Sequence, residues 1–516
     1  MARINSNVAS LVARSNLSKT NSDLQVRLVR LATGLRINKG ADDPAGLIVS
    51  QRLRSEVSGL QQAINNSDRA SSVIATTESA LSEVNGLLNS LKALVVEAAN
   101  TGAVSDEERT ANQLQIDSAI DSITRISNSA SFGGLKLLNG ELDYVLSGMA
   151  SSAVTKAQIF GANFAGQKNV KVDVQTVASA QTGRLFLRGD YSNTAYNGTF
   201  QSSVTLEVSG SRGVQVIEIL SGRPLSEVVA AVNSFREVTG VSASLLNAGN
   251  LSSGLSFSTI DYGSSEFVSV KRLNGPTDGG FFKTFQIANN QSVPGAFSFA
   301  NGAHAALLAA SNRDAGRDVF AIVNGALTTG KGIKLSSQNS SSLSFDLLLS
   351  KDFATINGSS TTFRITGGGA LYQLGGDINT TQQINIGFQS VAASKLGGTL
   401  IGSSVDFLSS IKSGGANDLA TRNFTNASSI LQTAIDEISV LRGRLGALER
   451  NTLDTNARSL QTAIENLTAS ESRIADADFA AETSALTRAQ VLSSTGTSVL
   501  TLANQQSQQV LRLLGG

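Results

Sequence analysis

The fold is decided by residues 28–88, LVRLATGLRINKGADDPAGLIVSQRLRSEVSGLQQAINNSDRASSVIATTESALSEVNGLL. A heptad seam runs into this stretch, with steps of seven, four, three and four between Leu17, Leu24, Leu28, Leu31 and Leu35. Such steps are typical of a helix that packs along one side. Gly40 breaks the pattern, and Asp43 can cap a new helix with Pro44 in its first position, where a missing N–H costs nothing. We therefore expect two consecutive helices.

The second of these helices carries two apolar columns. Ile74, Leu81, Leu88 and Val95 recur every seven residues, and Val73, Ala80, Leu87 and Leu94 lie one position to the side. Together they predict a face wide enough for two partner helices. A helix over residues 57–100 would be about 66 Å long at about 1.5 Å per residue, which is too long for one compact globule.

Helical periodicity returns in the last part of the chain. Steps of four and three connect Ala434, Ile438, Leu441, Leu445 and Leu448. The same alternation, with Gly496 and Gln506 as exceptions, continues through Ala485, Ala489, Leu492, Gly496, Val499, Ala503, Gln506, Val510 and Leu513. An unshielded apolar stripe is unusual in a soluble monomer, and isolated helices are marginal in water. We expect the terminal segments to become ordered when several copies pack together.

Residues 145–400, between the helical parts, have a different texture. Short alternating or β-branched runs lie between clusters of Gly, Ser, Asn and Thr, which is typical of strands and turns. Examples are Val204–Val208, Val214–Leu220, Leu255–Ser258 and Phe267–Val270. The sequence therefore predicts an α+β multidomain fold, in which long helices from both ends form a coiled-coil or helical-bundle core around which a β-rich central insert is added.

Composition excludes several kinds of chemistry. The 516 residues include no Cys and a single His, His304, which excludes disulfides, thiolate metal sites and sites with two imidazoles. Lys and Arg total 41 against 40 Asp and Glu, so we expect no basic face for nucleic acid. The sequence lacks an apolar run long enough for a membrane span, and its N-terminus shows no cleavable signal peptide. We expect no catalytic residue, cofactor or metal site.

Three short motifs match catalytic patterns without their context. Gly325–Gly332 satisfies GxxxxGK, yet a strand-like IKL follows where a P-loop would begin a helix. Ser409–Lys412 fits SxxK, but the companion SDN and KTG motifs are missing. His304 lies in GAHAALLAA without catalytic partners. We interpret them as a glycine-rich turn, a chance match and an ordinary helix residue.

Several motifs at both ends of the chain resemble bacterial flagellin. Residues 28–88 are similar to the N-terminal signature of that family, and SFGGLKLLNG at residues 131–140 is similar to the segment that closes it. Residues 472–514 resemble the flagellin C-terminus, so the resemblance covers about residues 1–140 and 405–516. In the insert, residues 183–273 resemble the flagellin IN module, and residues 282–400 look like a second β-rich unit.

The resemblance implies a structural, non-enzymatic subunit that self-assembles into the flagellar filament used for swimming. It implies an extracellular protein, exported unfolded by the type III apparatus with its export chaperone and without signal cleavage. Its partners would be identical subunits in a homopolymer and the hook-associated junction and cap proteins. The implied domains are a core helix (1–40), shell helices (41–144), an IN-like unit (145–280), a second β-rich unit (281–404), a shell helix (405–472) and a core helix (473–516).

The residues expected at the self-assembly interface lie on the seams and on the connector between them. ADDPAG, residues 41–46, matches the family's connector, where the acids can bond backbone N–H groups or bases such as Arg36, or act simply as a cap and turn. The expected interface residues are Leu24, Leu28, Leu31, Leu35, Asp42, Asp43, Pro44, Ile74, Leu81, Leu88, Val95, Leu492, Val499, Val510 and Leu513.

One further stretch, residues 86–100, matches the segment that the flagellin-sensing Toll-like receptor reads in many members. Leu88 and Leu94 match there, but the family's central arginine is Ser90 and an expected glutamate is Gln115. We therefore expect these leucines to be shell contacts rather than receptor contacts. Three alternatives to a filament subunit stay open: a hook–filament junction protein with similar termini, an enzyme displayed on a filament, and an adhesin that binds glycans through the insert.

Overall fold

The computed structural model describes residues 6–164, 166–187, 203–247, 254–274, 283–287, 297, 299, 302–337, 343–402 and 404–514. The chain divides into two compact units. The first contains Met1–Ser71, Tyr372–Gln383 and Leu448–Gly516, and the second contains Ser72–Leu371 and Ile384–Ala447.

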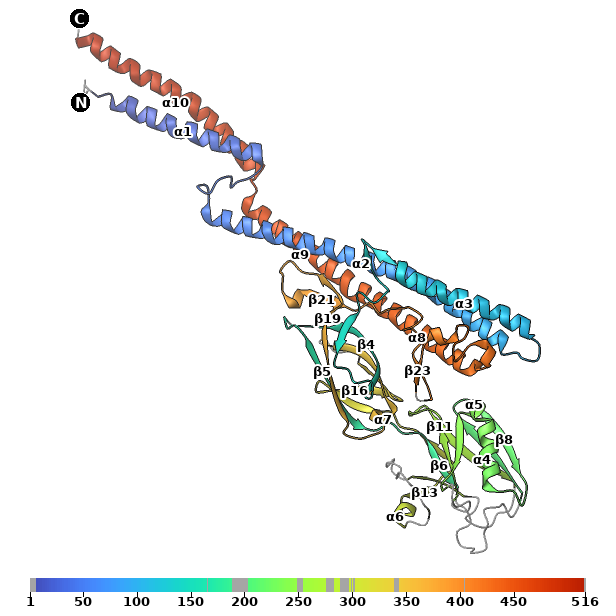
Figure 1. Cartoon of the computed structure of the whole chain (residues 1–516). Helices are drawn as coiled ribbons and strands as arrows, with labels where there is room; N and C mark the ends of the chain where they lie inside the picture. The colour runs from blue at the N-terminus through green and yellow to red at the C-terminus, as the bar shows by residue number, and fades with distance from the viewer. Residues whose placement is uncertain are drawn as a thin grey trace. The chain divides into compact units, whose positions relative to one another are not determined.

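The first unit is built from helices. Its termini form α1 (Val8–Thr33) and α10 (Phe479–Leu514), which lie side by side (Figure 1). The Asn7 side chain accepts a hydrogen bond from the Ser10 N–H at the start of α1, and Gly34, in the left-handed conformation, ends that helix. The unit also contains the beginning of α2 (Pro44–Ala98), the π-helical segment η7 (Glu449–Leu453), α9 (Asp454–Ala475) and the short 3₁₀ helix η4 (Thr380–Gln382).

Three helices of the second unit confirm much of the predicted periodicity. The end of α2, α3 (Asp106–Ser129) and α8 (Phe424–Leu448) lie alongside one another (Figure 1). The predicted column Ile74, Leu81, Leu88 and Val95 is buried, as are Ala434, Ile438, Leu441 and Leu445 of α8. The second predicted column of α2 is mostly only half-buried at Ala80, Leu87 and Leu94. The helix instead buries Val84, Leu91 and Ala98, because residues three after the first column lie on the same face at about 3.6 residues per turn.

An eight-stranded antiparallel sheet forms the inner part of the insert. Its strand order is β3-β19-β5-β15-β16-β17-β18-β4. The strands are β3 (Tyr144–Ser147), β4 (Val154–Ala162), β5 (Val170–Ala178), β15 (Phe320–Val323), β16 (Ala326–Lys331), β17 (Lys334–Ser337), β18 (Leu343–Leu349) and β19 (Ser360–Gly368). Alternate residues of these strands form one hydrophobic core that includes Phe345 and Phe363. The Tyr144 hydroxyl on β3 accepts the N–H of Ala162 on β4 at 2.9 Å, so the two edge strands are linked.

An outer module is inserted between β5 and β15. Its two sheets have the orders β13-β12-β6-β10-β9 and β14-β11-β7-β8, and α4 packs on the core that they share. The elements are β6 (Arg184–Leu187), β7 (Val204–Gly210), β8 (Val214–Ile219), α4 (Leu225–Ser234), α5 (Arg236–Thr239), β9 (Val241–Leu245), β10 (Leu255–Thr259), β11 (Phe267–Asn274), β12 (Thr284–Ile287), α6 (Gly302–Ala305), β13 (Leu308–Ala310) and β14 (Arg313–Ala315). The four predicted strand runs all lie in this module.

Strand pairing crosses the boundary at residues 280/281 that the sequence suggested. Strands β4 and β5 come before it, yet β4 pairs with β18 and β5 pairs with β15 and β19. The outer module therefore interrupts the inner sheet. The remaining elements are β1 (Ser131–Phe132), β2 (Leu135–Lys136), α7 (Lys351–Ala354), β20 (Ala370–Gln373), β21 (Gln383–Ile386), β22 (Thr399–Ile401), β23 (Ser404–Asp406), η5 (Leu408–Ile411) and η6 (Leu419–Thr421).

Candidate assembly interface

The contact between α1 and α10 is made largely by small and polar residues. On α10 the seam includes Ala489, Gly496 and Ala503, which are spaced seven residues apart, as a helix that packs along one side requires. A Cβ added to Gly496 would lie 3.2 Å from Cδ1 of Leu17 on α1, so the two helices approach closely here. No described residue of α1 is fully buried by this contact.

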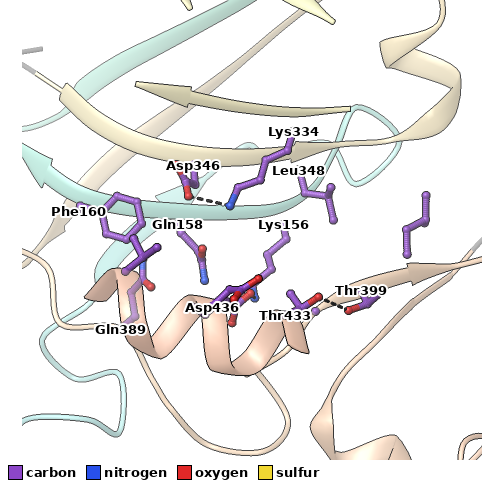
Figure 2. A pocket seen from close by; sticks show the side chains of 14 residues that line it. Lys156, Gln158, Phe160, Lys334, Asp346, Leu348, Gln389, Thr399, Thr433 and Asp436 are labelled. Carbon is purple, nitrogen blue, oxygen red and sulfur yellow. Dashed lines mark hydrogen bonds and ion pairs between the residues drawn. The ribbon is translucent and has the colours of Figure 1, made fainter. Parts of the chain in front are cut away.

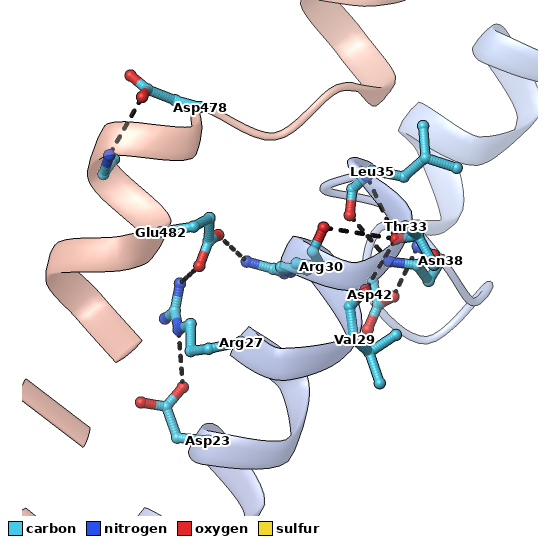
Figure 3. A network of polar contacts seen from close by, with 11 residues as sticks. Asp23, Arg27, Val29, Arg30, Thr33, Leu35, Asn38, Asp42, Asp478 and Glu482 are labelled. Atoms are coloured by element: carbon cyan, nitrogen blue, oxygen red, sulfur yellow. Dashed lines mark hydrogen bonds and ion pairs between the residues drawn. The ribbon is translucent and has the colours of Figure 1, made fainter. Parts of the chain in front are cut away.

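A charged cluster joins the C-terminal part of α1 to the start of α10 (Figure 3). Glu482 of α10 is only 7% exposed, and its carboxylate accepts hydrogen bonds from Arg27 at 2.9 Å and Arg30 at 3.1 Å. Asp23 also pairs with Arg27, at 3.2 Å. Burial alone would raise the pKa of Glu482, but the two guanidinium groups outweigh it, so the pKa is lowered. The carboxylate therefore stays charged and holds α10 to α1.

Hydrogen bonds continue along the rest of the pair. The Ser493 hydroxyl donates to Asn21 Oδ1 at 2.8 Å, and the Ser10 hydroxyl donates to Asn504 Oδ1 at 2.7 Å. Asn7 Nδ2 donates to the carbonyl of Ala503 at 2.9 Å. These bonds fix the register of the two helices without using their large apolar side chains.

Many large apolar side chains of this pair are left in contact with solvent. Leu28, Leu492 and Val499, all predicted interface residues, are 48%, 48% and 49% exposed. Leu24, Leu31 and Leu35 are half-buried, whereas the side chains of Val510 and Leu513 lie outside the described part of the structure. Further exposed apolar residues of the pair are Val8, Leu11, Val12, Val26, Val29, Phe479, Val491 and Leu502. A pair of helices with this surface needs another apolar surface to cover it.

The connector between α1 and α2 is held by its acids, as the sequence suggested. Asp42 accepts hydrogen bonds from the N–H groups of Asn38 at 3.0 Å and Lys39 at 2.9 Å, and these bonds lower its pKa. Asp43 accepts from the Gly46 N–H at 2.9 Å and so caps α2, which begins at Pro44. Arg36 does not pair with either acid, since its guanidinium donates to the Ile474 carbonyl at 2.6 Å.

The predicted interface residues in the heptad column of α2 are buried within the subunit, unlike those of the terminal helices. Ile74, Leu81, Leu88 and Val95 are at most 1% exposed within a single subunit. A contact with another copy or with a receptor would require these side chains to leave the core, so we assign them to the packing of the subunit itself. Leu94 is half-buried.

A cavity of about 310 Å³ lies in the second unit between α8 and strands β4, β17 and β18 (Figure 2). Lys156 Nζ lies 2.6 Å from Glu437 Oε1, and Lys334 Nζ lies 2.8 Å from Asp346 Oδ2. Glu437 Oε2 also accepts the Gly397 N–H at 3.1 Å. The Lys156–Glu437 pair links β4 to α8 and so helps to hold α8 against the sheet, whereas Lys334 and Asp346 lie on the neighbouring strands β17 and β18.

The three sequence matches to catalytic patterns lie in ordinary structural positions. Gly325–Gly332 covers a turn and the strand β16, and a P-loop would instead lead into a helix. Lys412 pairs with Asp121 at 2.6 Å, and the His304 ring stacks on Phe297. Among the described residues, no group of three or more acidic, His or Cys side chains is placed to bind a metal. No helix within the described ranges is long and apolar enough to cross a membrane.

Sequence reasoning missed Glu482, Arg27 and Arg30. A usable indication was present, because Glu482 lies seven residues before Ala489 and so falls on the same column as Gly496 and Ala503. An acid on an otherwise small-residue seam predicts a basic partner on the facing helix.

Sequence comparisons with known proteins find flagellins. Residues 4–143 match the bacterial flagellin N-terminal helical region, and residues 429–514 match the bacterial flagellin C-terminal helical region. The chain is 29% identical to a flagellin from Salmonella rubislaw and 29% identical to a B-type flagellin from Pseudomonas aeruginosa, with 99% of each chain covered in both cases. Among solved structures, a flagellar hook associated protein-3 from Legionella pneumophila is 12% identical, with a TM-score of 0.28 and a coverage of 82% of this chain and 98% of its own.

Proposed function

The chain belongs to the bacterial flagellin family, and from this membership we infer that it is the structural subunit of a flagellar filament. The filament serves swimming motility, so the assembled protein is extracellular. A hook–filament junction protein is not favoured, because relatives that match over 99% of this chain are flagellins.

The observation that carries this function is the exposed apolar surface of the α1–α10 pair. Small and polar residues join the two helices, while Leu28, Leu492 and Val499 stay largely outside the contact. Burying a Leu or Val side chain stabilises by roughly 1.5–3 kcal/mol, so covering several of them in each subunit supplies a substantial driving force. Identical copies provide the surface, and repetition gives a helical polymer.

We also propose the partners and the domain arrangement of the subunit. The subunit is exported unfolded, with a chaperone, by the type III apparatus and without signal cleavage, and it meets junction and cap proteins at the filament ends. It has no enzymatic activity. Residues 1–40 and 473–516 form the filament core, residues 41–144 and 405–472 form the shell, and residues 145–404 form a projecting insert. Burial of Leu88 argues against detection by the Toll-like receptor through that residue.

The test replaces one exposed leucine of the terminal pair. Leu28→Asp introduces a charge into the proposed contact between copies, so we expect monomers that no longer form filaments at concentrations where the wild type does. The control is Leu327→Asp on β16 of the insert, where the leucine is 70% exposed, and this variant should assemble normally. Electron microscopy and sedimentation measure assembly, and circular dichroism checks that the monomers are folded. Normal filaments from Leu28→Asp would refute the proposed core packing.

A further inference from the structure

An isoleucine in the first unit is almost completely exposed at the tip of a loop. Ile378 is 90% exposed, the highest value among the exposed large hydrophobic residues of the described chain. It lies in the loop of residues 374–382, between β20 and β21. Isoleucines on protein surfaces are common. A side chain that is almost fully exposed is unusual when hydrogen bonds order the backbone around it.

Internal hydrogen bonds order the loop on both sides of Ile378. Before the tip, Gln373 Nε2 donates to the carbonyls of Gly375 at 2.9 Å and Asp377 at 2.7 Å. After the tip, Asn379 Oδ1 accepts from the N–H groups of Thr381 and Gln382. Gln382 Oε1 accepts the Asp377 N–H at 2.8 Å and so ties the two sides together. These bonds order the backbone on both sides of the isoleucine.

The loop is also attached to the helices of its unit. Asn456 Nδ2, on α9, donates to the Leu374 carbonyl at 2.7 Å. On α2, a Cβ added to Gly59 would lie 3.4 Å from the Gly376 carbonyl oxygen, and a Cβ added to Gly376 would lie 3.3 Å from Leu60 Cδ2. The loop and α2 are therefore in close contact at these positions. The tip is thus presented from a fixed base on two long helices.

We propose that Ile378 is an assembly contact that inserts into an apolar surface of a second copy of this chain. This inference rests on the proposed filament function and extends the interface beyond the terminal pair. We infer that the partner is another copy of this chain because the same unit offers exposed apolar side chains that could receive Ile378. They lie on α1, on α10 and at the start of α2, where Ile48 is 68% exposed. A polymer that covers the terminal helices brings neighbouring copies of this unit together, and a rigid apolar tip adds a specific contact at little entropic cost.

The chain offers a direct test because it contains no cysteine. A nitroxide spin label on Ile378→Cys should give a mobile spectrum in the monomer and a strongly immobilised one in the filament. The matched control is Leu327→Cys on the insert, whose label should keep the same mobility in both states. In seeded polymerisation, Ile378→Asp should raise the critical concentration about tenfold, whereas Ile378→Val should stay near the wild type.

The outcomes separate this inference from the proposed function. If filaments form and the label at position 378 is as mobile as in the monomer, Ile378 contacts no second copy and the inference is wrong, while the filament function stands. The same conclusion follows if Ile378→Asp polymerises like the wild type. If the label becomes immobile only after cap or junction protein is added, the partner is that protein rather than a second copy. If wild-type protein forms no filaments under any condition, the proposed function itself fails.

Discussion

At the residue scale, the feature that explains most about the terminal pair is the buried carboxylate of Glu482. A charge on a seam between two helices destabilises their contact unless it is paired, because desolvation costs several kcal/mol. Arg27 and Arg30, one helical turn apart on α1, both reach this carboxylate. The cluster therefore specifies which end of α10 lies beside which part of α1, a register that alanines and glycine alone would leave loose.

The lowered pKa of Glu482 makes this register pH-dependent. A carboxylate whose pKa is lower in the folded state stabilises the fold above its unfolded pKa of about 4.3, and this stabilisation is lost as the pH falls through the folded value. We expect Glu482→Gln to raise the critical concentration for polymerisation about fivefold at pH 7, which corresponds to about 1 kcal/mol for partly exposed pairs. The difference from the wild type should disappear at pH values below the folded pKa, where Glu482 is itself neutral.

Seeded polymerisation followed by sedimentation at pH values from neutral to acidic measures both effects. Glu471→Gln is the control, since it removes a pair with Arg54 whose guanidinium is about half exposed, and it should change assembly little. A gap between Glu482→Gln and the wild type that persists at acidic pH would show that the loss comes from altered packing rather than from charge.

At the element scale, an ion pair links the insert to α8. The side chains of Lys156 and Glu437 are 15% and 13% exposed, and their ion pair joins β4 to α8 across the cavity. Breaking such a pair leaves the other charge poorly solvated, which costs more than the pair itself contributes. Replacing one residue of the pair should therefore destabilise the contact more than replacing both.

This sensitivity gives a prediction for the stability of the second unit. Lys156→Met should destabilise it by about 2–4 kcal/mol, because Glu437 is left charged and without its ammonium partner. The double variant Lys156→Met, Glu437→Gln should recover most of the loss, since the amide oxygen can still accept the Gly397 N–H. Calorimetry of the full-length monomer measures the transition. As a control, Lys171→Met removes the exposed pair with Asp173 and should change stability by less than about 1 kcal/mol. Equal losses in the single and double Lys156 variants would contradict this account.

The helices and strands show how much of the fold can be predicted from the sequence. The start of α2 at Pro44 and the buried column from Ile74 to Val95 were predictable, because capping and heptad spacing are local properties of a helix. The strand runs of the outer module were also predictable, because alternation of residue types is likewise a local property of the sequence. The pairing of β4 with β18, almost two hundred residues later, was not, since alternation marks a strand but says nothing about its neighbour. Ile378 was missed because exposure of a loop residue depends on hydrogen bonds that no pattern records.

At the scale of the whole molecule, the outer module is attached through a narrow, glycine-lined junction. Gln181 and Arg317 exchange two backbone hydrogen bonds of 2.9 Å, which brings the entering and leaving chains together. A Cβ on Gly183 would lie 3.2 Å from the Gly316 nitrogen, and one on Gly316 would lie 2.6 Å from the Gln181 carbonyl oxygen, so neither site has room for a side chain. The chain therefore leaves and re-enters the inner sheet at almost one point.

Because the two ends of the module are adjacent, its removal should not disturb the rest of the molecule. We expect a chain that lacks residues 184–315, with Gly183 joined directly to Gly316, to fold its eight-stranded sheet and its helices and to form filaments. The physical reason is that the buried cores of the module are its own and that, in the described part of the chain, no strand of the inner sheet comes from it, although Tyr262 packs against the core of the inner sheet. Electron microscopy tests for filaments, and circular dichroism with proteolysis tests the monomer, with Leu28→Asp in the shortened chain as the negative control. A shortened chain that is folded as a monomer yet never polymerises would mean that the outer module contributes contacts between subunits, and the terminal helices would then be insufficient for assembly.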